Sequence, residues 1–79
     1  MEIINMIEPN RKYWDFLDRE TFIGDDVISL VNQRCGRVVS WTAGGNPRII
    51  DWNKITKKFT NLKPAALTGR WIVIRPLEG

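Results

Sequence analysis

The chain of 79 residues contains no histidine and a single cysteine, Cys35. Without histidine, the commonest general base is missing, and so are the catalytic triads that depend on it. One cysteine forms no intramolecular disulfide and, without histidine, builds no Cys/His zinc site. We therefore expect a protein that is not an enzyme and that uses no metal or other cofactor.

Long apolar segments are missing as well. The longest uninterrupted apolar run covers only a few residues, far below the roughly 20 that a membrane-spanning helix needs. The first residues, MEIINMIE, lack the basic start and the long apolar stretch of a signal peptide. Together with the lone thiol, these features favour a cytoplasmic protein. The length is about half of the commonest domain size, so we expect one domain over residues 1–79.

Charge is distributed unevenly along the chain. Residues 1–33 contain three basic and seven acidic side chains, a net charge of −4, whereas residues 34–79 contain nine basic and two acidic ones, a net charge of +7. A basic region of this size attracts phosphate backbones or an acidic protein surface. The alternative is that the acidic part folds onto the basic part and the charges pair internally.

Two runs of β-branched and aromatic residues, 37–41 and 48–52, flank the turn-forming sequence TAGGNP. Glycine and asparagine tolerate a positive φ, and proline does not extend a central strand, so the pattern predicts a β-hairpin. With Trp41 opposite Arg48, one face of the hairpin would carry Arg37, Val39, Trp41, Arg48, Ile50 and Trp52.

Helix caps predict three short helices. Asn10, Asp25 and Asn53 are each suited to the N-cap position, and Gly36 and Pro64 act as stop signals. The expected helices cover residues 11–20, 26–35 and 54–63. The second of these is also rich in β-branched residues, so a strand is the alternative there.

The remaining segments complete an α+β fold. Residues 70–75, RWIVIR, predict a strand that ends before Pro76, and residues 1–7 predict a short edge strand. The expected architecture is a small three-stranded antiparallel sheet, made of the hairpin 37–41/48–52 and the strand 70–75, with two or three short helices.

Two segments resemble known families. Residues 26–59, which end in GGNPRIIDWNKITKKF, resemble the helix, wing and trailing helix of small winged-helix proteins of the excisionase type. That resemblance implies that Arg48, in the wing, would contact DNA phosphate. Residues 22–41, FIGDDVISLV followed by GRVVSW, resemble the opening strands of small Tudor or KOW-type barrels. This second resemblance implies a small β-barrel as the alternative fold.

Four tryptophans are many for a chain of this length. Trp14 and Trp71 lie in apolar stripes, so we expect them in the core. Trp41 and Trp52 share their expected face with arginines, and such a surface can stack bases while guanidinium groups hold phosphates. The alternative is that this face packs into the core and that the arginines extend to solvent.

The leading expectation is a small non-enzymatic accessory protein that binds nucleic acid, DNA or RNA, with a basic face. The alternative is a protein-interaction module or inhibitor, of the kind that phages and mobile elements carry, docking on an acidic protein surface. The candidate binding residues are Arg37, Trp41, Arg48, Trp52, Lys54, Lys57 and Lys58. No membrane and no small-molecule substrate is inferred.

Overall fold

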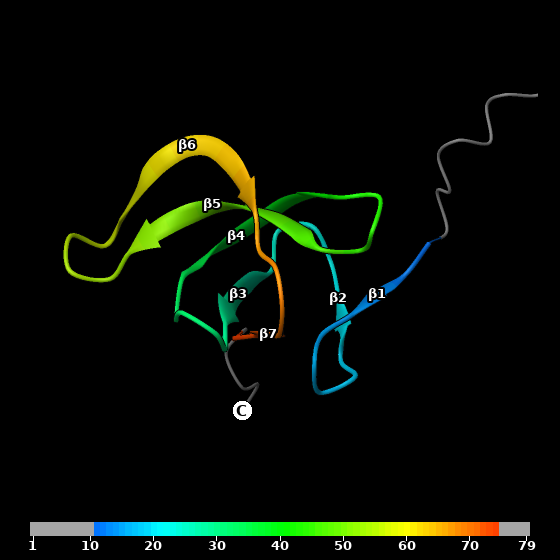
Figure 1. Ribbon diagram of the computed structural model, residues 1–79. Helices are drawn as coiled ribbons and strands as arrows, with labels where there is room; N and C mark the ends of the chain where they lie inside the picture. The colour runs from blue at the N-terminus through cyan, green and yellow to red at the C-terminus, as the bar shows by residue number, and fades with distance from the viewer. Residues whose placement is uncertain (1–10, 75–79) are drawn as a thin grey trace, which may run out of the picture.

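The structure, a computed structural model, describes residues 11–74 apart from the side chain of residue 61. The elements are β1 (Tyr13–Trp14), β2 (Glu20–Thr21), β3 (Asp26–Ser29), β4 (Cys35–Trp41), β5 (Pro47–Asn53), β6 (Lys58–Ala66) and β7 (Trp71–Val73) (Figure 1). Within the described range every element is a strand, so the expected α+β class is wrong. None of the helices expected over 11–20, 26–35 and 54–63 forms, while the expected strand 1–7 and the cap Asn10 lie outside the described residues.

The strands form two sheets. β1 and β2 make a small two-stranded sheet, and the other five make an antiparallel sheet in the order β6-β5-β4-β3-β7. β7, expected beside the β4–β5 hairpin, instead pairs with β3. β5 and β6 form an arched hairpin whose turn points away from β1 and β2 (Figure 1). A winged-helix arrangement is excluded for residues 26–59, since all of its elements are strands.

The segment expected as a helix over 26–35 forms β3 and a turn. Val27 and Ser29 are buried and alternate with more exposed neighbours, which is the period of a strand. The Asp25 carboxylate accepts a hydrogen bond from the Phe22 N–H, at 2.8 Å, so it closes the preceding turn rather than capping a helix. Of the two alternatives for this segment, the strand is the one that forms, and it pairs with β4.

The segment expected as a helix over 11–20 is a tight β1–β2 hairpin. Asp15 and Arg19 do form the expected ion pair, at 2.9 Å, but across a turn. Asp15 accepts hydrogen bonds from the N–H groups of Leu17 and Arg19, and Asp18 takes a left-handed conformation with φ 61°. Side-chain bonds to nearby N–H groups favour turns over helix interiors.

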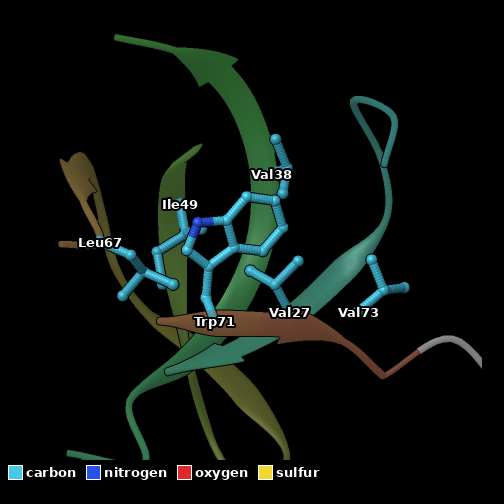
Figure 2. Packing of buried hydrophobic residues seen from close by; sticks show 6 residues of the cluster. All are labelled: Val27, Val38, Ile49, Leu67, Trp71 and Val73. Atoms are coloured by element: carbon cyan, nitrogen blue, oxygen red, sulfur yellow. The ribbon is translucent and has the colours of Figure 1, made fainter. Parts of the chain in front are cut away.

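The core lies on one face of the five-stranded sheet, which we call the inner face. It consists of Val27, Val38, Ile49, Leu67, Trp71 and Val73, which converge in Figure 2. Trp71 is therefore in the core as expected, but Trp14 is not, because 53% of it is exposed. β4 and β5 approach closely at Gly36, where a Cβ atom would collide with the Ile50 carbonyl oxygen.

The hairpin predicted from TAGGNP is confirmed, since β4 and β5 pair antiparallel around a reversal at residues 42–46. Gly45 supplies the positive φ, 90°. The predicted register is wrong by one residue, because Trp41 pairs with Pro47 instead of Arg48. Beyond Ser40, one extra residue in β4 forms a β-bulge and shifts the pairing by one residue more, so Arg37 pairs with Ile50 where the predicted register would pair it with Trp52.

Candidate functional site

The bulge separates the two tryptophans that the sequence placed together. It turns Trp41 to the inner face, where the ring stacks on Tyr13 with centroids 4.0 Å apart and packs against Trp71 at 6.0 Å. Trp52 lies on the opposite face, which we call the outer face. Its position follows from strand alternation, because Ile49 points inward. The structure therefore removes Trp41 from the candidate surface and leaves Trp52 on it.

The outer face also carries the two candidate arginines. Arg37 pairs with Ile50 and Arg48 pairs with Ser40, both on the side of the sheet opposite the core pair Val38 and Ile49. Arg48 is exposed at the end of β5 that is remote from the β5–β6 turn. The structure thus brings Arg37 next to the aromatic side chains described below and leaves Arg48 at a distance along the strand.

The three candidate lysines all lie in or directly after the turn that joins β5 and β6. Asn53 does accept hydrogen bonds as a helix cap would, from the N–H groups of Ile55 at 2.8 Å and Thr56 at 2.9 Å. The helical conformation ends after a single turn, because Lys57 takes a left-handed conformation with φ 58°. The chain then returns as β6, and Lys54, Lys57 and Lys58 are exposed at the end of the hairpin.

An aromatic pair stands at the base of this turn. Trp52 and Phe59 are cross-strand partners, and their rings meet edge to face with centroids 4.8 Å apart. The Arg37 guanidinium lies 5.1 Å from the centre of the Phe59 ring, within cation–π range. Phe59 was missed as a surface residue because it lies within the helix expected over 54–63. The alternation of β6 would have revealed it only if residues 54–57 had been recognised as a turn.

Ion pairs between Asp15 and Arg19, between Asp26 and Arg37 and between Asp51 and Arg34 show how the charges cancel. The Asp26–Arg37 pair joins the acidic part of the sequence to the basic part. Arg48 and the three turn lysines form no ion pair with a carboxylate among residues 11–74. Internal pairing therefore leaves the end of the β5–β6 hairpin positively charged.

Two of these pairs are strengthened by geometry. Arg34 donates two hydrogen bonds to the Asp51 carboxylate, at 2.6 and 2.9 Å, which raises the pKa of the Arg34 guanidinium. Burial alone would raise the pKa of Asp15, but hydrogen bonds from the N–H groups of Val73, Arg19 and Leu17 and from the Arg19 side chain outweigh it and hold the pKa below its ordinary value. Asp15 thus links the β1–β2 hairpin to β7 by accepting the hydrogen bond from Val73, and we call this contact the latch.

A pocket of about 220 Å³ opens on the outer face beside Trp52. It is lined by Asp26, Cys35, Gly36, Arg37, Trp52 and Ile74. The Cys35 thiol is free but buried, and it faces the Trp52 carbonyl oxygen at 3.8 Å. The only charged groups in the lining are the paired Asp26 and Arg37, so the pocket combines an apolar floor with one polar edge.

Residues 11–74 hold no group of three or more acidic or cysteine side chains placed to bind a metal ion. They also contain no helix of the length and hydropathy that would span a membrane. The candidate surface therefore consists of the basic turn, the Trp52–Phe59 pair, Arg37 and the pocket. In comparisons with protein-family models, curated proteins and solved structures, the chain matches none of them.

Proposed function

We propose that this protein is a non-enzymatic module that binds nucleic acid through the end of the β5–β6 hairpin. The observation that carries the proposal is the group of three exposed lysines, Lys54, Lys57 and Lys58, within five residues and without an ion pair to any carboxylate of residues 11–74. Lysines that neutralise phosphates release counterions, and this supplies most of the affinity of non-specific binding.

The turn geometry supports this role, because it holds the lysines on an ordered support. The Asn53 side chain binds two backbone N–H groups of the turn, and the Asn53 carbonyl oxygen accepts a third hydrogen bond from Lys57 at 2.8 Å. The lysine side chains themselves stay free to follow a phosphate backbone. We place the protein in the cytoplasm, since a single free thiol suits a reducing compartment.

The test is the salt dependence of binding to single-stranded DNA, duplex DNA and RNA. The variant Lys54→Gln/Lys58→Gln removes two charges and leaves Lys57, with its left-handed backbone, unchanged. We expect weaker binding to all three ligands and a salt slope smaller by up to about 2. The matched control, Lys12→Gln/Arg70→Gln, removes two exposed charges outside the hairpin and should change the slope less. Absence of salt-dependent binding by the wild type at about 50 mM salt would overturn the proposal.

One observation favours a second candidate, an interaction module for an acidic protein. Ile55 lies between the lysines of the turn and is 90% exposed. An apolar side chain surrounded by cations suits a protein interface with a polar rim. In that case the lysine substitutions should lower the association rate more than they raise the dissociation rate. Binding that survives nuclease treatment would favour this candidate.

A further inference from the structure

The pocket beside Trp52 has three kinds of wall. Trp52 forms an apolar wall of the pocket. Its ring packs edge to face against Phe59, and 37% of the residue remains exposed. The floor is formed by the backbone of Gly36 and by the buried Cys35.

The third wall is polar and held in place. Arg37 donates from Nε to Asp26 Oδ1, at 3.0 Å, and its guanidinium rests on the Phe59 ring. A guanidinium has five N–H donors, so most of the Arg37 donors remain for a ligand, and Asp26 keeps acceptor capacity of its own. The edge of the pocket therefore offers a donor and an acceptor side by side.

We infer that this pocket takes one unpaired base of a single-stranded nucleic acid, an inference that rests on the proposed function. A base has a π face that can stack on Trp52 and an edge with both donors and acceptors that can bind Arg37 and Asp26. The volume, about 220 Å³, is smaller than the roughly 300 to 1,000 Å³ of sites for drug-sized ligands, so it suits a single ring system.

The neighbouring lysines fit the same ligand. Asn53 and Lys58 pair in the register directly next to Trp52 and Phe59. A nucleic-acid strand whose base occupies the pocket would therefore reach the basic turn with its next phosphates. A paired base in a duplex offers neither a free face nor a free edge of this kind, because its faces are stacked and its pairing edge is occupied. The pocket therefore distinguishes a single strand from a duplex, whereas the lysines bind both.

The experiment compares the affinities of a single-stranded oligonucleotide and a duplex of the same sequence at one salt concentration. The variants are Trp52→Leu, which keeps an apolar side chain without a π face, and Trp52→Phe, which keeps an aromatic ring. Trp14→Leu is the matched control, because Trp14 is exposed on β1, away from the pocket. Urea unfolding verifies that each variant is folded.

We expect the wild type to prefer the single strand. Trp52→Leu should weaken single-strand binding by roughly 5- to 150-fold, the range for loss of one base–aromatic stack, with duplex binding unchanged. Trp52→Phe should retain most of the affinity, and Trp14→Leu all of it. If the lysine-dependent, salt-dependent binding is present but Trp52→Leu weakens both ligands equally or neither, the base pocket is wrong and the proposed function stands. If no nucleic acid binds, both are overturned.

Discussion

Trp41 and Trp52 lie on adjacent strands, β4 and β5, but on opposite faces of the same sheet. Trp41 is enclosed between Tyr13 and Trp71, whereas Trp52 contacts only one ring, Phe59, among the aromatic pairs of residues 11–74 and borders a pocket. The β-bulge in β4 makes this difference, because one extra residue reverses the side to which Trp41 points. Whether an aromatic residue lies in the core or at the surface therefore depends on the backbone register as much as on its own chemistry.

On the inner face, residues at the start of the described range pack over Trp41. Tyr13 of β1 covers Trp41, and Arg11 covers Tyr13 at 4.8 Å from the ring centre. On the outer face, Trp52 pairs with the Phe59 ring and Arg37 lies over that ring. We therefore expect substitutions on the inner face to lower stability and substitutions on the outer face to lower binding.

The largest expected effect is that of Trp41→Ala. Removing a ring that is packed between two others should lower the free energy of unfolding by about 3 to 5 kcal/mol. Urea unfolding measures this change. A loss below about 1 kcal/mol would show that Trp41 adds little to the core it packs against and would remove the contrast with Trp52.

A somewhat smaller effect is expected for Asp15→Asn, which weakens the latch between the β1–β2 hairpin and β7. The side chain accepts hydrogen bonds from the N–H groups of Leu17, Arg19 and Val73, of which the bond from Val73 is fully buried. Leaving a buried donor unpaired costs about 1 to 3 kcal/mol. Since an amide oxygen replaces part of the carboxylate, we expect a loss of about 3 kcal/mol in total. Thermal or urea unfolding that matches the wild type would show that the latch is not needed.

The same carboxylate makes stability depend on pH. The folded pKa of Asp15 lies below its ordinary value, so its contribution is fully present above the unfolded pKa, about 3.9, and is lost as the pH falls through the folded pKa. We expect the wild type to lose stability below about pH 4 more steeply than Asp15→Asn does. Equal slopes of the two proteins in this range would contradict the assignment.

Gly45→Val should have an intermediate effect. Gly45 has φ 90° in the β4–β5 turn, and a β-branched residue is strained there. A Cβ atom would also lie 3.5 Å from the Arg11 guanidinium, which covers Tyr13. We expect a loss of about 1 to 2 kcal/mol in unfolding free energy. Gly44→Val is the matched control, because Gly44 is not among the positive-φ residues and a Cβ atom there would make only an ordinary contact with Thr42 Oγ1, at 3.9 Å.

A smaller effect on stability than that of Trp41→Ala is expected for Trp52→Ala. The ring is partly exposed and contributes one edge-to-face contact, which is worth about 0.5 to 1.5 kcal/mol beyond its buried area. The loss should therefore remain well below that of Trp41→Ala in the same unfolding assay. A loss as large as that of Trp41→Ala would show that the outer face is also part of the core.

Local signals in the sequence predicted some of these features and not others. Gly45 and Pro47 predicted the hairpin correctly, because turn chemistry is a local property. The prediction that Asn53 caps a helix is wrong, because Asn53 caps a single turn, and the two kinds of cap look the same in sequence. The left-handed Lys57, which ends the turn, has no signature of its own.

The candidate site, too, could be predicted from the sequence only in part. The lysines and Trp52 could be identified from composition and alternation, whereas Trp41 could not be excluded, because nothing in RVVSW marks the bulge. Asp26 and Phe59 were assigned to helices, so their meeting with Arg37 on the outer face depended on long-range strand pairing. Such pairing is set by the whole fold and leaves no local pattern.

The most direct test of the division between the two faces measures two properties of two conservative variants, Trp41→Phe and Trp52→Leu. For each, urea unfolding gives the stability and a titration with single-stranded oligonucleotide gives the affinity of the folded protein. We expect Trp41→Phe to lose stability with its affinity unchanged and Trp52→Leu to lose affinity with its stability nearly unchanged. Loss of the same property in both variants would contradict the division between the two faces.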